Sequence, residues 1–425
     1  MKDTKSNIKF TVIIPTRERA DTLESSLKTC TTQDYDNFEI IVSDNLSQDN
    51  TREVVEANKD NRIRYINTGK RMSMTSNYEF ALSHATGDYV CIIGDDDGIM
   101  PNALQELNKV LFGTEIEAII WKRAGYFWNQ YYKSELRNTL QASLKSSFRK
   151  YDSKETVKEL LAFKPGSNLN FFSDLACLYH GFIRRDTIDR LRLPDGRFFN
   201  STLPDVYASL VVSCAVENLY QSDVPYSLSG ISKHSTGFSS ENSQSLQKFL
   251  SEIDIPPHPH MKIVPYSYAL CTAECILKIQ ENFPETRKFE LNIKGMTRKA
   301  MEDAVDLSAD NYQFVADAVK YTCEVYGIQE HANQVIAQNP NSPAISPVIL
   351  GYNFLNDYLV LKLNEDVKNI YDATLAYKKL IEKNLYGFYI LEGNRFLLSS
   401  VKNYGIRNSI SKGIRRISDK LGFAS

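Results

Sequence analysis

The chain has 425 residues and a formal net charge of -2, with 24% charged and 42% hydrophobic residues. This length exceeds the usual size of one domain, so we expect one large domain and a second unit. The near-neutral charge, and the lack of a basic stripe with interleaved aromatic residues in the first 250 residues, argue against a nucleic-acid partner. The apolar runs fall short of the roughly 20 residues that cross a bilayer.

Targeting signals and the cysteine pattern indicate the cellular compartment in which the protein is expected. The first residues carry charges, but Pro15 and Arg17 interrupt the apolar stretch that a secretory signal would need. The seven cysteines are scattered, and Cys271 and Cys275 have no second pair to complete a zinc site. We therefore expect a cytoplasmic protein with reduced, buried cysteines.

Short apolar runs alternate with helical patterns over the first part of the chain. Runs that are rich in β-branched residues and too short for helices predict strands at 10–15, 38–43, 63–67, 89–93 and 118–121. Apolar residues spaced by three or four positions predict helices at 22–27, 51–57, 77–85 and 101–111. The alternation predicts an α/β fold with a mostly parallel sheet and helices on both faces.

The pattern changes along the rest of the chain. Residues 131–170 are polar and helical in patches, which predicts an excursion or lid over the sheet. A strand at 178–183 and an apolar helix at 206–216 follow.

A serine-rich and proline-rich segment after residue 240 is typical of a linker. Beyond it, residues 268–279 and 311–325 have the spacing of amphipathic helices. We therefore predict a catalytic α/β domain over residues 1–240 and a mainly helical region over residues 241–425.

Polar residues follow three of the predicted strands: Pro15, Thr16 and Arg17 the first, Asp44 and Asn45 the second, and Asp95, Asp96 and Asp97 a later one. The carboxyl ends of parallel strands share one edge of a sheet, where ligands bind, so we expect these residues to meet in one crevice. Three adjacent carboxylates repel one another. Mg²⁺ or Mn²⁺ bridging them to a substrate phosphate would relieve the repulsion, and a solvated acidic turn is the alternative. GxGxxG and P-loop motifs are absent, which argues against dinucleotide and P-loop proteins.

Taken in order and at this spacing, residues 12–19, 38–51 and 92–101 resemble the family 2 glycosyltransferases, which are nucleotide-sugar-dependent enzymes with the GT-A fold. The resemblance covers about residues 8–240. It implies that the turn at Pro15, Thr16 and Arg17, together with Asp44, holds the nucleotide, and that a basic residue faces the diphosphate. For Asp44 the alternative is that it caps the turn before Ser47. The residues at the basic position are Lys70 and Arg71, for which a solvated surface pair is the alternative, and Asn77 lies near the same site.

The resemblance also assigns the acidic triplet to the Asp-x-Asp metal site of the family. It implies that Asp97 binds Mn²⁺ or Mg²⁺ directly and that Asp95 contacts the ribose or the water shell of the metal, while Asp96 can exchange roles with its neighbours. Gly94 stands where the family commonly has an aspartate. His234, in a polar loop, is either a ligand to the metal or diphosphate or an ordinary loop histidine.

Inverting members of the family use a carboxylate at a helix start as the general base. Asp205 matches that position, after Pro204. It would deprotonate the acceptor hydroxyl, and a helix-capping role is compatible with this one. His180 either faces the acceptor or is a structural histidine of the core.

The resemblance therefore predicts a metal-dependent, inverting glycosyltransferase of surface polysaccharide synthesis. It would move a single sugar from a nucleotide donor, expected to be UDP-linked, to a glycan or lipid-linked saccharide. One alternative is a nucleotide- or carbohydrate-binding protein that kept the fold but lost turnover. A second is a nucleotidyltransferase, although that reaction needs a glycine-rich loop and residues 16–19 contain no glycine.

The end of the chain suggests how such an enzyme reaches its acceptor. Residues 401–425 carry an isoleucine stripe at helical spacing, flanked by lysines and arginines. A basic amphipathic helix of this kind either lies on the inner face of the membrane or docks on its own domain or a second subunit, which would make a homo-oligomer.

Overall fold

A computed structural model of the chain describes residues 7–143, 147–167, 174–235, 243–262, 264–343, 351–353 and 358–382. The basic segment at 401–425 lies outside these residues. Among the described residues, none of the helices has the length and apolar character needed to span a bilayer.

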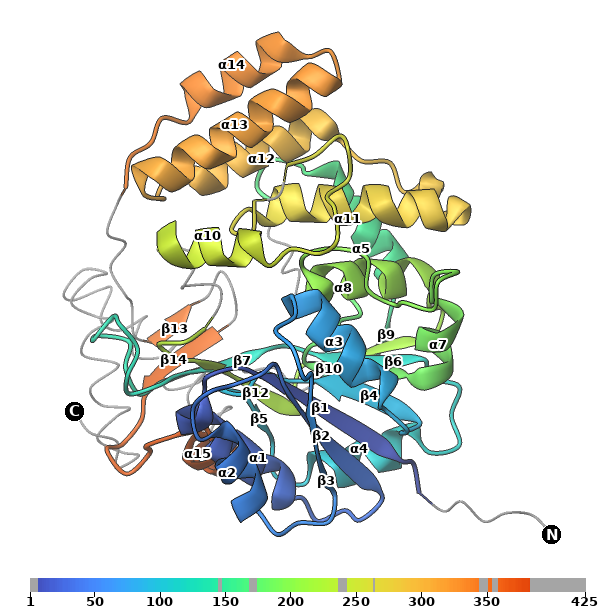
Figure 1. Ribbon diagram of the computed structural model, residues 1–425, viewed down its shortest axis with the longest axis vertical. Coiled ribbons are helices and arrows are strands. Elements are labelled where there is room, and N and C mark those ends of the chain that lie inside the picture. Colours follow the sequence, from blue (N-terminus) through green and yellow to red (C-terminus); the bar gives the residue numbers. More distant parts are fainter. Residues whose placement is uncertain are drawn as a thin grey trace, which may run out of the picture.

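A large sheet forms the centre of the molecule (Figure 1), with strand order β3-β2-β1-β4-β10-β6-β11-β9. Its strands are β1 (Phe10–Thr16), β2 (Phe38–Asp44), β3 (Ile63–Asn67), β4 (Tyr89–Ile92), β6 (Ala118–Trp121), β9 (Phe148–Tyr151), β10 (Gly181–Arg184) and β11 (Leu219–Ser222). Strands β3, β2, β1 and β4 are parallel, as predicted. Strand β10 is antiparallel to both β4 and β6.

Alternate residues of β1 enter two different cores, which explains why the whole strand is apolar. Val12 and Ile14 pack with α1 (Ala20–Thr31), α2 (Thr51–Ala57) and α4 (Ala103–Leu111) on one face. Ile13 packs with α3 (Met74–Ser83) and α8 (Pro204–Ala215) on the other. A strand with helices on both faces has no solvated side, so it reads as a continuous apolar run. The α/β prediction is confirmed.

A second sheet lies beside the first, with strand order β13-β14-β8-β7-β12-β5. Its strands are β5 (Gly98–Ile99), β7 (Ala124–Phe127), β8 (Thr139–Ser143), β12 (Ser227–Ile231), β13 (Gly351–Asn353) and β14 (Tyr358–Lys362). Strand β14 pairs with β8, and α15 (Ile370–Glu382) packs against α1. The end of the described chain therefore returns to the N-terminal half (Figure 1), where the sequence predicted no strands.

The described residues of the stretch 131–170, which are 131–143 and 147–167, form regular elements instead of the predicted lid. They supply β8, β9 and α5 (Ser153–Ala162), and α5 packs against α8. Strand β9 pairs with β11 at the edge of the large sheet. The strands of this stretch were not predicted because its apolar residues are few and because β8 and β9 gain part of their stability from the distant strands β14 and β11.

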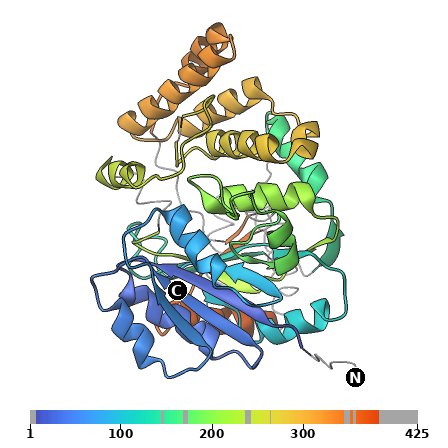
Figure 2. The same cartoon turned by 45° about the vertical axis from the view of Figure 1, so that its right-hand side comes forward.

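Helices stack above the large sheet in Figures 1 and 2. They are α10 (Ser243–Ser251), α11 (Tyr268–Asn282), α12 (Ile293–Ala304), α13 (Ala309–Val325) and α14 (Gln329–Gln338). Helix α11 packs against α8, so one apolar core runs from the sheet into the helices. The helical character predicted after residue 240 is confirmed for residues 243–338, whereas the division into two domains stays a prediction.

Gly230 of β12 lies directly against the turn that follows β4. A Cβ atom on Gly230 would stand 1.7 Å from the carbonyl oxygen of Asp96. We expect Gly230→Ala to lower the free energy of unfolding by roughly 2–3 kcal/mol, because the turn must move to admit the methyl group. Urea unfolding followed by circular dichroism measures the change.

Gly125 of the neighbouring strand β7 provides the control. Its added Cβ would meet no atom closer than 3.5 Å, so Gly125→Ala should change stability by less than about 1 kcal/mol. Equal losses in the two variants would contradict the close approach of β12 to the acidic turn.

Candidate active site

A cavity of about 400 Å³ opens at the carboxyl ends of the parallel strands. Its lining includes seven of the predicted site residues: Pro15, Thr16, Arg17, Asn77, Asp95, Asp96 and Asp205. The predicted residues Asp44, Arg71, Asp97 and His234 are not among its lining residues. Asn45 of the second strand exit also lines the cavity, so the three strand exits and the start of α8 meet in one place, although they lie far apart in the sequence.

The carboxylate of Asp97 is fully buried and surrounded by hydrogen-bond donors. Its Oδ2 accepts from the Tyr179 hydroxyl at 2.6 Å, from His180 Nε2 at 2.8 Å and from the Gly94 N–H at 2.6 Å. Its Oδ1 accepts from the Gly230 N–H at 2.7 Å. Burial raises the pKa of Asp97, but its pairing with His180 and the hydrogen bonds from Tyr179 and Gly230 prevail over burial and lower the pKa. Asp97 thus stays ionised, and both of its oxygens accept hydrogen bonds from other groups of the protein.

His180 has a structural place in this network, the second of the two alternatives given for it. Its Nδ1 lies 2.6 Å from the Ser227 hydroxyl, and its Nε2 faces Asp97. Burial lowers the pKa of His180, which favours a neutral ring that donates from Nε2 and accepts at Nδ1.

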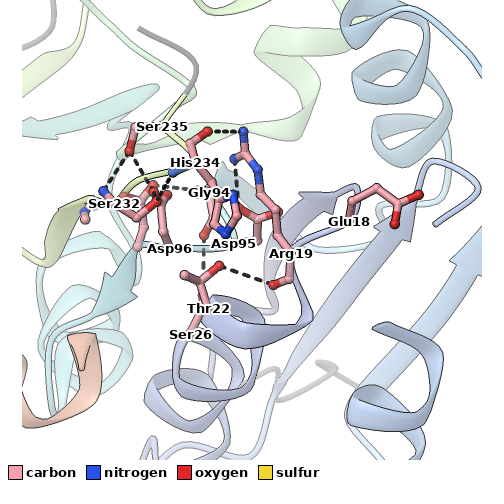
Figure 3. Close-up of polar contacts among 12 residues, drawn as sticks. Glu18, Arg19, Thr22, Ser26, Gly94, Asp95, Asp96, Ser232, His234 and Ser235 are labelled. Atoms are coloured by element: carbon pink, nitrogen blue, oxygen red, sulfur yellow. Dashed lines mark hydrogen bonds and ion pairs between the residues drawn. The ribbon is translucent and has the colours of Figure 1, made fainter. Parts of the chain in front are cut away.

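Asp96 faces the cavity in a different environment. Its Oδ2 accepts from the hydroxyls of Ser232 at 2.6 Å and Ser235 at 2.8 Å (Figure 3). Burial, followed by the charges of Asp97 and Asp95, raises the pKa of Asp96 to about 7. The triplet therefore carries more negative charge than its surroundings neutralise, which is the condition that a bound cation would relieve.

Arg19 is a functional candidate that the sequence analysis did not assign. Its Nη1 lies 3.0 Å from Asp95 Oδ1, and its Nη2 donates to the His234 carbonyl oxygen (Figure 3). Burial lowers the pKa of Arg19, but the charges of Asp95 and Asp96 prevail and raise it, so the guanidinium stays charged. In the sequence, the only indication of a functional role for Arg19 was its position in the polar segment after the first strand.

His234 is held near the triplet mainly through its backbone. Its ring Nε2 lies 3.2 Å from Asp21 Oδ2, on α1. Arg19 contacts its carbonyl oxygen rather than its ring. The imidazole therefore pairs with Asp21 in this structure, and its predicted role as a metal ligand stays a prediction.

Metal binding depends on the donor atoms that the described residues provide. Within the described ranges, no three histidine, cysteine or acidic side chains form a cluster that could hold a metal ion by themselves. Mg²⁺ and its relatives, however, commonly use one or two carboxylates and complete their shell with substrate phosphates and water. Asp95 and Asp96, both lining the cavity and rich in hard oxygen donors, fit that arrangement.

The nucleotide side of the cavity begins at Thr16, which is 3% exposed. Its Oγ1 is buried and has no hydrogen-bond partner in the part of the chain that the structure describes. A buried hydroxyl without a partner is costly, so this atom is suited to a ligand. Asn77, also in the lining, accepts from the Ser43 hydroxyl at 2.7 Å.

Asp44 lies beneath this side of the cavity and already has three donors. They are the Tyr65 hydroxyl at 2.6 Å, Asn67 Nδ2 at 3.0 Å and the Ser47 N–H at 2.9 Å. The last contact is the turn-capping alternative noted from the sequence. Its predicted contact with the nucleotide stays a prediction.

The acceptor side of the cavity is formed by the start of α8. Pro204 opens the helix, and the carboxylate of Asp205 accepts the N–H of Val206 at 2.9 Å. Burial raises the pKa of Asp205. The hydrogen bond from the Val206 N–H and the charge of Arg123 lower it, but they offset only part of the effect of burial. A carboxylate of raised pKa in a cavity is a candidate general base. Tyr268 of α11 lines the same side.

Comparisons with known proteins connect part of the chain to one family. Residues 11–177 match the family model described as glycosyl transferase family 2. The chain is 37% identical over 102 residues to the GalNAc(5)-diNAcBac-PP-undecaprenol beta-1,3-glucosyltransferase of Campylobacter jejuni, covering 23% of this chain and 33% of that protein. It is 29% identical over 94 residues to the UDP-Glc:alpha-D-GlcNAc-diphosphoundecaprenol beta-1,3-glucosyltransferase WfgD of Escherichia coli, covering 22% of this chain and 37% of that protein.

The matched segment spans about a third of the length of these relatives. Among solved structures, S. aureus TarS 1-349 in complex with UDP-GlcNAc aligns with a TM-score of 0.45 and 14% identity over 80% of this chain and 95% of that chain. A similarity this distant adds nothing to the assignment of the site.

The raised pKa of Asp96 predicts how stability depends on pH. An acid whose pKa rises from 3.8 to about 7 on folding binds its proton more tightly in the folded state. Its stabilising contribution is therefore complete below about pH 4 and lost as the pH rises towards 7. We expect Asp96→Asn, which cannot ionise, to gain roughly 2–3 kcal/mol over the unsubstituted chain between pH 5 and pH 8.

Urea unfolding at the two pH values, in the presence of a chelator, measures this difference. The same titration of Asp186→Asn, at an exposed aspartate in the first turn of α7 (Arg185–Arg190), provides the control. Parallel pH profiles for Asp96→Asn and the unsubstituted chain would show that Asp96 is ionised as usual.

Proposed function

We propose that the chain, whose residues 11–177 match the model of glycosyl transferase family 2, transfers one sugar, with inversion, from a nucleotide-sugar donor to a saccharide acceptor. The observation that carries the proposal is the cavity itself. It brings the carboxylates of Asp95 and Asp96 together with that of Asp205, which comes from a different element. In the proposed reaction, Asp95 and Asp96 would hold the cation that meets the donor phosphates, and Asp205 would accept the proton of the acceptor hydroxyl.

We assign the donor to the side formed by the exits of β1, β2 and β4. The buried hydroxyl of Thr16 would receive a hydrogen bond or donate one to the nucleotide, and Arg17 would face its phosphates. UDP is the expected nucleotide, because the name of the relative from E. coli specifies UDP-Glc as its donor.

We assign a divalent cation, Mn²⁺ or Mg²⁺, to Asp95 and Asp96. Bound there, the cation would neutralise the charge of the departing nucleoside diphosphate. Asp97, the residue predicted from the sequence as the direct ligand, instead has four protein donors around its two oxygens. We therefore propose that Asp97 holds the turn in place while Asp95 and Asp96 present oxygens to the ligand.

We assign the acceptor to the side of Asp205 and Tyr268. Asp205 would take the proton of the acceptor hydroxyl as that oxygen attacks the anomeric carbon. Both relatives are named for lipid-diphosphate-linked saccharide acceptors, so a lipid-linked saccharide at the cytoplasmic face of the membrane is the proposed acceptor class.

The proposal distinguishes transfer from simple binding. We expect Asp205→Asn to lower kcat by about 10²–10⁴ with little change in the affinity for UDP, because only the proton acceptor is lost. The measurement is sugar transfer to a synthetic lipid-linked acceptor, with UDP affinity from calorimetry. Asp186→Asn, which changes a first-turn acid outside the cavity, is the control.

Residual transfer near the original rate in Asp205→Asn would place the base elsewhere. The absence of transfer in the unsubstituted chain, together with intact UDP binding, would favour the alternative of a binding protein without turnover.

Chelation tests the cation. We expect EDTA to weaken UDP binding by roughly tenfold or more, because the diphosphate would then face Asp95 and Asp96 without a counter-charge. In Asp96→Asn the effect of EDTA should shrink, since one of the two proposed ligands is lost. Calorimetric titration of UDP with Mn²⁺ or with EDTA provides the comparison, and equal affinities for the unsubstituted chain would refute the assignment.

A further inference from the structure

Residues 252–254 lie along the donor side of the cavity and bring two carboxylates to it. Glu252 bridges two arginines that come from distant parts of the chain. Its Oε2 lies 2.8 Å from Arg17 Nη1, after β1, and its Oε1 lies 2.8 Å from Arg71 Nε, after β3. Burial raises the pKa of Glu252, but the hydrogen bonds and charges of the two arginines prevail and lower it. The carboxylate is thus an anion held between two cations.

Asp254 makes equivalent contacts at the start of α3. Its Oδ1 accepts from the Ser73 hydroxyl at 2.7 Å, and its Oδ2 accepts from the Ser76 hydroxyl at 2.5 Å. Ser73 is the N-cap of α3, where the helix dipole favours negative charge. Hydroxyl donors beside two guanidinium groups are a set of partners that would equally suit phosphate oxygens.

We propose that Glu252 and Asp254 form an acidic strap that fills the anion-binding half of the cavity, and that the donor diphosphate displaces it. This inference rests on the proposed function, because the donor is taken to be a nucleotide sugar. The Thr16 hydroxyl supports it independently: it is buried in the same cavity, it lacks a partner among the described residues, and the strap does not supply one.

The strength of the contacts permits such an exchange. The side chains of Arg17, Arg71 and Glu252 are 31%, 37% and 20% exposed, and ion pairs with this much access to water contribute little stability. A diphosphate carries more charge than a carboxylate, and the planar guanidinium binds phosphate in two-pronged fashion. The diphosphate therefore competes well for both arginines.

The strap is anchored at one side, so its displacement does not require the helices to separate. Lys278 of α11 donates to the carbonyl oxygen of Pro256 at 2.6 Å and pairs with Glu274 at 3.0 Å, with both charged side chains buried. Glu274 also accepts from the Ser201 hydroxyl at 2.7 Å. The chain after the strap is therefore fixed, while Glu252 and Asp254 are held mainly by contacts that a phosphate can replace.

Removing the competing charge tests the strap. We expect Glu252→Gln to bind UDP, and inorganic pyrophosphate as a minimal probe, about three- to tenfold more tightly than the unsubstituted chain. Asp254→Asn should act in the same direction and serves as a second variant if Glu252→Gln is poorly folded. Glu290→Gln removes the same charge from an exposed position outside the cavity and should leave both affinities unchanged.

Amide hydrogen exchange in the unsubstituted chain provides a readout that is independent of the variants. Adding UDP or pyrophosphate should increase exchange at residues 252–254. Slower exchange there would show that the segment closes over the ligand, and unchanged or weaker affinity in both strap variants would show no competition. Either result overturns the inference.

The failure of the strap and the failure of the proposed function give different results. Sugar transfer by the unsubstituted chain, with UDP affinity unchanged in Glu252→Gln and Asp254→Asn, removes the strap alone. Tighter pyrophosphate binding in the strap variants, in a chain that neither binds UDP nor transfers sugar, keeps the strap and removes the donor assignment.

Discussion

The buried carboxylate of Asp97 holds the site together. Its four donors come from the turn after β4, from the segment before β10 and from β12 of the second sheet. Burying an ionised carboxylate is costly unless its oxygens are satisfied, so these donors cannot separate without exposing an unpaired charge. Both sheets are therefore tied to the acidic turn, and the close packing of Gly230 against Asp96 follows from this attachment.

The three adjacent aspartates differ because like charges at this distance cannot share one environment. Asp97 is stabilised as an anion by hydrogen bonds, Asp95 is paired with Arg19, and Asp96 has a raised pKa in spite of two serine hydroxyls. The three residues are identical in the sequence, yet only the carboxylates of Asp95 and Asp96 line the cavity. The surroundings of each carboxylate, rather than its place in the motif, decide which can serve a ligand.

Local patterns in the sequence were sufficient for the first strands and helices. The strand predicted at 63–67 is β3 residue for residue, because its pattern and its turn signals are local. The direction of β10 and the pairing of β14 with β8 were not predictable in this way, since they depend on partners far along the chain. The same limit applies to the site. The polar residues that follow the strands could be recognised in the sequence, and the family resemblance pointed to Asp205. The pairs of Arg19 with Asp95 and of Glu252 with Arg17 exist only through tertiary contacts.

Each half of the cavity contains an ion pair within the protein at the place of a proposed ligand. In each pair, one side chain carries a charge of the same sign as that ligand. Arg19 provides a cation beside Asp95 and Asp96, where a metal ion is proposed, and Glu252 provides an anion between Arg17 and Arg71, where a diphosphate is proposed. A donor and its cation bring both charges together, so they can replace both internal partners in one binding event. A cation alone would leave the arginines paired with Glu252, and a diphosphate alone would face Asp95 and Asp96. On the proposed assignments, the arrangement would therefore favour the complete complex of donor and metal over either component by itself.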